Sequence, residues 1–263
     1  MSSRRVLPVA LAILMLATGP AYAGGHKPKP SPSPTPATYD VSYPQCGKTL
    51  PAPIDGGIVG VNNGIAFSSN PCLATQWAWA VNGPTYAPAF YLNTANPGAA
   101  YSSHWPTSQS SPQVCNGENN TACSYDYGWN YATDALNRAR AVTSVATTVQ
   151  WWLDVETGNS WQTLESAYGQ TATSKANDRA SVAGAVDALN AAGVPAVGIY
   201  STSYQWTQIT GGTGTQFAAQ SAWVAGTGSL STAQSNCHTT SFTTGPITLA
   251  QYASNGYDAD YHC

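Results

Sequence analysis

The sequence predicts an α/β protein built on a closed, mainly parallel barrel. Strand-like and helix-like segments alternate from residue 39 onward, which is typical of a parallel sheet covered by helices. The chain has 263 residues, enough for one large domain of this kind. Polar residues end several of the strand-like segments, and in such barrels the functional groups lie at the C-terminal ends of the strands.

The strand-like segments are short apolar runs bounded by Gly, Pro or polar residues. Eight of them can be found, which is the number that closes a barrel of this type. In chain order they cover residues 39–42, 58–62, 88–93, 148–156, 195–201, 222–225, 247–252 and 256–261.

Helix-like segments occupy the early gaps between the strands. Apolar residues recur every three or four positions in 125–145 and in 175–192, which indicates two amphipathic helices. Two shorter segments, 72–81 and 204–209, can also form helices.

The remaining gaps favour loops. No helical period is present in 226–246 or 253–256, and 46–57 is rich in Pro and Gly. We therefore expect fewer helices after the fifth strand. The stretch 94–124 is rich in Ser, Asn, Pro and Gly, and long loops in compact domains are usually functional.

The N-terminal part is expected to be a secretory signal followed by a spacer. Residues 1–23 combine two arginines, an apolar run and a small-residue cleavage site, which predicts cleavage after Ala23. Residues 24–38 alternate Pro with Ser, Thr or Lys, as in extended linkers. The folded domain is expected to cover 39–263, and the mature protein to be secreted or associated with the cell wall.

Composition excludes some partners. Only 8% of residues are charged, and beyond residue 38 five basic residues face twelve acidic ones, a net charge of about −7. Nucleic acid is not an expected partner, because phosphate binding needs a basic surface. No second apolar stretch is long enough to span a membrane, and we expect a monomer.

Six cysteines lie beyond the expected signal. An even number in an exported protein predicts three disulfides, for which fifteen pairings exist. Their order along the chain favours three local pairs, 46–72, 115–123 and 237–263. The spacing matches no zinc pattern, so we expect neither a metal nor another cofactor. The residues are Cys46, Cys72, Cys115, Cys123, Cys237 and Cys263.

Two acids end the fourth strand-like segment, Trp151-Trp152-Leu153-Asp154-Val155-Glu156. Successive side chains of a strand point to opposite faces, so Asp154 and Glu156 are expected to share one face. Two carboxyls side by side resist joint ionisation in a dry site. This pairing is what acid–base chemistry on a glycosidic bond requires.

Other polar residues fall at the same expected rim. Tyr200, Tyr252 and Gln251 can form hydrogen bonds with sugar hydroxyls, and Trp105 in the long loop can stack on a pyranose ring. Rim residues predicted at strand ends are Asp40, Asn62, Asn93, Tyr200, Gln251 and Asp258.

The order of these pieces resembles the family 25 glycoside hydrolases, which are secreted lysozyme-type muramidases. The resemblance spans nearly all of 39–263 and implies an incomplete (β/α) barrel with eight strands and about five helices. The matching pieces are Tyr39-Asp40-Val41-Ser42-Tyr43-Pro44-Gln45, Leu153-Asp154-Val155-Glu156, Gly198-Ile199-Tyr200-Ser201, Trp223-Val224-Ala225, Gln251-Tyr252 and Gly256-Tyr257-Asp258-Ala259-Asp260.

Two pieces differ from the family pattern. A segment ending in Glu-Gly is replaced by Val61-Asn62-Asn63-Gly64, and a Tyr-His pair by Phe90-Tyr91-Leu92-Asn93; the closing Asn is Asp260. These departures fit a divergent, actinobacterial-type group of exported proteins that resemble glycoside hydrolases.

The resemblance implies roles for the acids. Glu156 is expected to be the proton donor, and Asp154 to steady a cyclic intermediate formed by the substrate's own N-acetyl group. Asp40 and Asp258 would complete an acidic ring. The structural alternatives are a carboxylate bound to loop N–H groups for Glu156, an ion pair for Asp154 and a turn cap for Asp40.

Three functions remain open from the sequence. The first is a muramidase that cleaves the glycan strands of peptidoglycan or another N-acetylated polysaccharide. The second is a non-catalytic wall-binding or glycan-binding protein that retains the barrel. The third is a surface protein that holds a protein partner through the loop 94–124.

Overall fold

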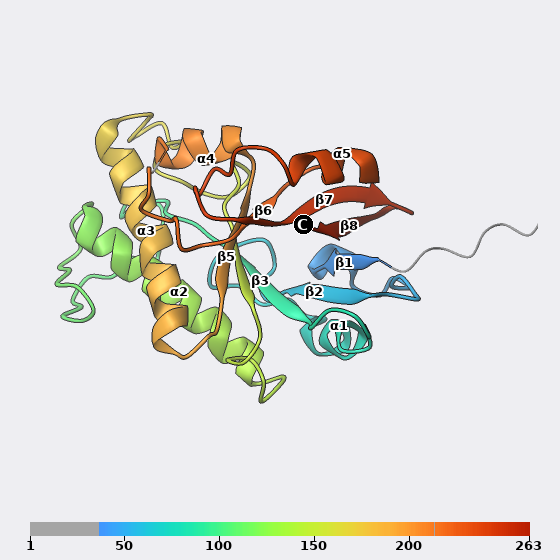
Figure 1. Ribbon diagram of the computed structural model, residues 1–263. Helices are drawn as coiled ribbons and strands as arrows, with labels where there is room; N and C mark the ends of the chain where they lie inside the picture. Colours follow the sequence, from blue (N-terminus) through green and yellow to red (C-terminus); the bar gives the residue numbers. More distant parts are fainter. Residues whose placement is uncertain (1–36, 213) are drawn as a thin grey trace, which may run out of the picture. The chain divides into compact units, whose positions relative to one another are not determined.

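The computed structural model describes residues 37–212 and 214–263, so the expected signal and nearly all of the expected linker lie outside the described residues. Eight strands form one closed barrel in chain order (Figure 1). Neighbouring strands are parallel except at the last one, which runs antiparallel to both of its neighbours. The strands are β1 (Thr38–Val41), β2 (Gly56–Gly60), β3 (Ala89–Asn93), β4 (Trp151–Asp154), β5 (Val197–Ser201), β6 (Ala222–Val224), β7 (Ile247–Ser254) and β8 (Tyr257–His262).

The described residues contain five α-helices, the number implied by the resemblance. The two longest, α2 and α3, pack along each other beside the barrel, while α1 lies against β2 and α5 against β7 (Figure 1). No described helix is long and apolar enough to cross a membrane. The helices are α1 (Leu73–Ala80), α2 (Thr121–Arg140), α3 (Ala172–Ala191), α4 (Ser203–Thr210) and α5 (Leu230–Asn236).

Two element predictions were wrong in detail. The gap 226–246 contains α5, although it has no helical period. This helix has no apolar stripe, because Ala233 is its only buried residue. Its N-cap is Ser229, whose side chain accepts a hydrogen bond from Thr232 N. The fourth strand ends at Asp154 rather than Glu156, because the chain turns there and Asn159 N binds the Glu156 carbonyl.

The barrel separates two apolar layers. Outward-facing residues of the strands pack against the helices, and inward-facing ones fill the barrel itself. Trp151 and Trp152 belong to the outer and inner layers respectively, as the alternation of a strand requires. The inner layer forms an apolar floor beneath the mouth of the barrel, and its buried members are Ile58, Ala89, Trp152, Trp223 and Leu249.

The floor depends on a glycine in β5. A Cβ built on Gly198 would lie 2.2 Å from Cζ3 of Trp152, so the indole occupies the place of a side chain. Changing Gly198 to Ala is expected to lower the free energy of unfolding by about 1–3 kcal/mol through overpacking. Urea denaturation would measure the loss. Gly158→Ala is a suitable control, because a Cβ there meets nothing within 4 Å, and equal stability of the two variants would contradict the expectation.

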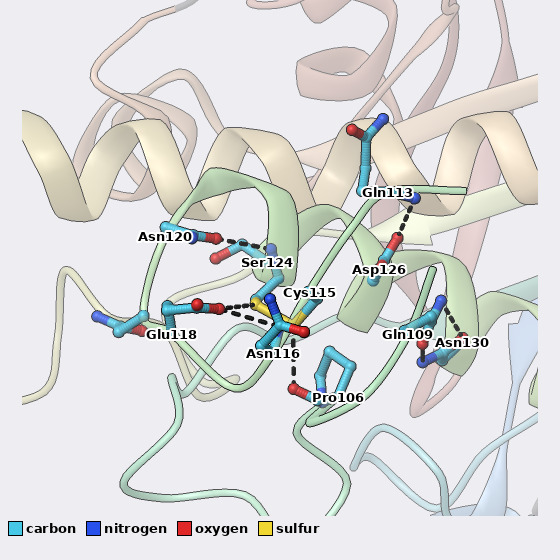
Figure 2. Close-up of a disulfide and its surroundings, with 12 residues drawn as sticks. Pro106, Gln109, Gln113, Cys115, Asn116, Glu118, Asn120, Ser124, Asp126 and Asn130 are labelled. Carbon is cyan, nitrogen blue, oxygen red and sulfur yellow. Dashed lines mark hydrogen bonds between the residues drawn. A yellow bond between two sulfur atoms is a disulfide. The ribbon is translucent and has the colours of Figure 1, made fainter. Parts of the chain in front are cut away.

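The disulfide pairing predicted from chain order is confirmed: Cys46–Cys72, Cys115–Cys123 and Cys237–Cys263. The second disulfide fastens the long loop to the start of α2 (Figure 2). Two further contacts hold this loop on α2, from Gln113 N to Asp126 and between the side chains of Gln109 and Asn130. The loop is therefore fixed to α2, the helix that follows it, at Gln109, Gln113 and Cys115.

Candidate active site

A pocket of about 360 Å³ opens at the mouth of the barrel, above the apolar floor. Its walls come from the C-terminal ends of the parallel strands and from the start of β8, which runs in the opposite direction. Four carboxyls line it. These are Asp40 of β1, Asp154 at the end of β4, Glu156 just beyond it and Asp258 of β8.

Asp40 and Asp258 meet where the barrel closes, because their Cα atoms are directly paired between β1 and β8. Burial, and next the charge of Asp258, raise the pKa of Asp40 to about 7. Gln251 Nε2 donates to Asp40 Oδ2 at 3.0 Å, and the Tyr200 hydroxyl donates to Gln251 Oε1 at 2.8 Å. This chain of hydrogen bonds fixes the orientation of the Asp40 carboxyl within the pocket.

Of the two acids at and just beyond the end of β4, Asp154 is the more deeply buried, with 5% of its surface exposed. Asn93, its neighbour on β3, donates a side-chain hydrogen bond to Asp154 Oδ2. Oδ1 is buried and has no partner among the described residues. Burial, followed by the charges of Glu156 and Asp40, raises the pKa of Asp154 well above its usual range. The carboxyl can therefore hold a proton and donate or accept at the pocket.

Glu156 is half-buried and lies in the loop that follows β4. The Glu156 carbonyl accepts a hydrogen bond from Trp161 Nε1 at 2.8 Å, which anchors this loop. Gln205 Nε2, in the first turn of α4, donates to Glu156 Oε1 at 3.3 Å. Gln205 Oε1 accepts from Thr157 N at 2.6 Å, and this donor fixes which end of the amide faces Glu156.

No Lys or Arg lines the pocket. The one ion pair in the described part of the chain joins Arg138 to Asp134, which lie on α2. No cation therefore offsets the charge of Asp40 or Asp154, which is consistent with the raised pKa values of these two carboxyls.

Most of the sequence-predicted site residues line this one pocket. They are Asp40, Asn93, Asp154, Glu156, Tyr200, Gln251 and Asp258. Three others do not. Asn62 uses its amide to bind the backbone of Asn93, with distances of 2.9 and 3.1 Å. Trp105 is buried beside Tyr127, and Tyr252 lines a different hollow.

Several residues in the pocket or in contact with its acids were not predicted. Tyr91 lies on β3 two positions before Asn93, so strand alternation was a signal that could have found it. Tyr43 and Asn159 belong to short connections with no such periodicity. Gln205 reaches Glu156 from α4, and no local pattern indicates that contact.

The described residues contain one cluster of side chains that could hold a metal ion. Cys115, Glu118 and Cys123 gather closely enough to hold an ion, but the two cysteines are joined in a disulfide. Their sulfurs are therefore not available as thiolate ligands.

No protein-family model and no curated protein sequence matches this chain. Solved structures that share its fold include two muramidases. The muramidase from Trichobolus zukalii is 14% identical with a TM-score of 0.52, and the muramidase from Acremonium alcalophilum is 16% identical with a TM-score of 0.53. Each alignment covers 87% of this chain and 94% of the other. At these identities the similarity establishes the barrel fold.

The pocket has the parts that hydrolysis of an acetal requires. It presents a half-buried carboxyl, a second carboxyl on the preceding strand end, and amide and phenol groups suited to hydroxyl-bearing ligands. A nucleophilic Ser or Cys paired with His is not among its lining residues. The arrangement favours acid–base chemistry on an uncharged polar substrate.

Proposed function

We propose that this protein is a glycoside hydrolase that cleaves the glycan strands of peptidoglycan as an N-acetylmuramidase. The observation that carries the proposal is the convergence of Asp154 and Glu156 with Asp40 and Asp258 in one open pocket at the barrel mouth. Peptidoglycan is the preferred substrate class because two proteins with the same barrel are muramidases.

In this proposal Glu156 protonates the glycosidic oxygen as the bond to the leaving sugar breaks. The donor from Gln205 occupies Oε1, so the proton to be transferred is held on Oε2. After departure of the first product, the same carboxylate accepts a proton from the water that attacks the sugar.

Asp154 acts on the substrate's N-acetyl group. Its carboxyl is oriented by Asn93 through Oδ2, which leaves Oδ1 without a protein partner. An acetamide N–H that donates to this carboxyl where it faces the pocket would align the acetyl oxygen for attack on the anomeric carbon. Substrate-assisted glycosidases use this route instead of a protein nucleophile. Tyr200 and Gln251 hold Asp40 at the opposite wall.

Export to the cell wall is part of the same proposal. Three disulfides favour an oxidising compartment. The sequence pattern of 1–23 favours a cleaved signal, and that of 24–38 a spacer that lets the barrel reach an insoluble polymer. We further propose that the barrel acts as a monomer and without a cofactor.

The second candidate is a non-catalytic glycan-binding protein. The observation in its favour is that Asn62 is engaged with the backbone of Asn93, where the resembled family has a segment ending in Glu-Gly. The Glu of that family segment is absent from this chain, so the neighbourhood of the pocket has one acidic group fewer than in the family. The third candidate, partner binding through 94–124, is weakened because much of this loop is fastened to α2 (Figure 2).

The deciding experiment incubates the purified protein with insoluble peptidoglycan and measures both bound protein and released reducing ends. The muramidase proposal expects reducing ends that are lost in the Glu156→Gln variant. Binding without release would favour the second candidate. Neither binding nor release, on peptidoglycan and on chitin, would reject both.

Gln205 gives a separate prediction. Gln205→Glu replaces the donor with an acceptor and adds a like charge beside Glu156, so the alkaline limb of the pH–rate profile is expected to move to higher pH. Gln205→Met removes the donor without adding charge, and its kcat is expected to fall about tenfold at unchanged KM. Steady-state rates on soluble glycan fragments across pH would test this. A KM effect alone would contradict the positioning role.

A further inference from the structure

A second hollow, of about 540 Å³, adjoins the acidic pocket. Gly64 and Asn159 line the acidic pocket, while their immediate chain neighbours Ile65 and Ser160 line the second hollow. The two spaces thus share a boundary formed by the same two loops. A ligand held in the acidic pocket can extend a branch across this boundary.

The second hollow combines aromatic rings with one carboxylate. Phe67 and His104 stack with ring centroids 4.2 Å apart, Tyr101 is 49% exposed, and Glu165 is the only acid in the lining. The one ion pair in the described residues does not involve Glu165. A carboxylate and aromatic rings that line the same hollow form a combination that can hold an ammonium group.

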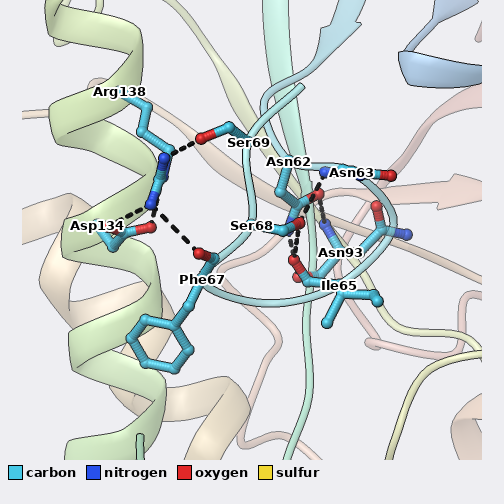
Figure 3. Close-up of polar contacts among 9 residues, drawn as sticks. All are labelled: Asn62, Asn63, Ile65, Phe67, Ser68, Ser69, Asn93, Asp134 and Arg138. Atoms are coloured by element: carbon cyan, nitrogen blue, oxygen red, sulfur yellow. Dashed lines mark hydrogen bonds and ion pairs between the residues drawn. The ribbon is translucent and has the colours of Figure 1, made fainter. Parts of the chain in front are cut away.

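Hydrogen bonds at both ends hold the loop that forms one wall of this hollow. The loop from Asn62 to Ser69 is fixed on one side by the bonds between Asn62 and Asn93, and on the other by Arg138 of α2, which donates to the Phe67 carbonyl at 3.2 Å and to Ser69 (Figure 3). Phe67 has a φ of 63°, which is uncommon for a bulky residue and occurs often at ligand-binding positions.

We propose that this hollow binds an amine-bearing peptide branch of the glycan strand whose sugars occupy the acidic pocket. This site rests on the proposed function, and the substrate feature that it recognises is the peptide branch. The amine pairs with Glu165, and the aliphatic stem of the amine-bearing residue lies against Ile65, whose side chain is 69% exposed. A polymer without peptide branches leaves both groups unused.

The first test measures binding without catalysis. The ¹⁵N-labelled full chain is titrated with the peptide L-Ala-γ-D-Glu-L-Lys-D-Ala and with the same peptide acetylated on the lysine amine. Amide shifts are expected at Ile65, Phe67 and Tyr101, with affinity about five- to tenfold lower for the acetylated peptide. Glu165→Gln is expected to weaken the free-amine peptide to the same extent, and Glu118→Gln to change nothing.

The second test uses cleavage. Glycan strands with peptide branches are compared with strands from which an amidase has removed them. The wild type is expected to prefer branched strands about tenfold in kcat/KM, and Glu165→Gln and the exposed-wall variant Ile65→Ser to lose the preference while keeping the rate on stripped strands.

The outcomes separate the two ideas. Peptide binding that depends on Glu165 in a protein that cleaves nothing would reject the hydrolase proposal and retain this site. Cleavage with no preference for branched strands, or amide shifts that Glu165→Gln leaves unchanged, would overturn the peptide site and retain the hydrolase. Binding of unbranched chitin fragments at Ile65 and Tyr101, unaffected by Glu165→Gln, would assign the hollow to sugars instead.

Discussion

Changing Glu156 to Gln is expected to lower the rate of glycan cleavage by about 10²–10⁴-fold, because the variant has no proton to give to the leaving oxygen. The fold is expected to survive. Glu156 is half-buried, and a Gln side chain can keep an oxygen directed at Gln205 Nε2, which now lies 3.3 Å from Glu156 Oε1. The measurement is the release of reducing ends from peptidoglycan, with binding to the same material followed in parallel.

Glu118→Gln is the matched control. It makes the same chemical change at an exposed position beside the Cys115–Cys123 disulfide (Figure 2), and Glu118 is not among the residues that line the acidic pocket. Its rate should equal that of the wild type. If Glu156→Gln retained full activity while remaining folded, Glu156 would have no part in the chemistry and the enzyme proposal would lose its proton donor.

Stability is expected to fall as pH rises from about 5 to about 8. Burial raises the pKa of Asp40 to about 7 from 3.8, and it also raises those of Asp154, Asp258 and Asp260. A carboxyl with a raised pKa in the folded state stabilises that state below its unfolded pKa, and the contribution is lost as pH rises through the folded value. Asp40 alone accounts for a loss on the order of a few kcal/mol over this interval.

A substitution at Asp260 tests whether buried carboxyls cause this loss of stability with rising pH. It lies in β8 with 3% of its surface exposed, and neither carboxyl oxygen has a hydrogen-bond partner among the described residues. Asp260→Asn leaves the acids that line the pocket in place, but it removes an ionisable group and the repulsion between that group and Asp40 and Asp258, so the stability of the variant is expected to decline less steeply with pH. Urea unfolding at several pH values measures both slopes. A wild-type stability that is flat or increases toward pH 8 would contradict the buried-acid account.

The sequence predicted the barrel and its acidic mouth because both depend on local patterns. Short apolar runs locate strands, and a polar residue at the end of such a run must lie at the rim of a parallel barrel. Asp154 and Asn93 follow that rule and are neighbours between β3 and β4. Asp40 and Asp258 were expected to complete an acidic ring, and their Cα atoms are paired where the first and last strands close the barrel.

The features that were not predicted depend on how segments pack together, which no local sequence pattern encodes. Gln205 reaches Glu156 only because the first turn of α4 lies beside the end of β4. Trp105 lies in a long loop, where nothing in the sequence distinguishes a ring that faces a ligand from one packed on Tyr127. Helix α5 was missed because a short helix that buries only Ala233 carries no apolar period.

The pairing of β1 with β8 bears on when activity can appear during biosynthesis. Asp40 is made well before Asp258, so the acidic mouth cannot assemble on a nascent chain until β8 has emerged. Contacts between such distant residues form late and slowly, since closing a long loop costs entropy before the contact is gained. Under the proposed function, this order keeps the growing chain inert until β8 has been made and has paired with β1.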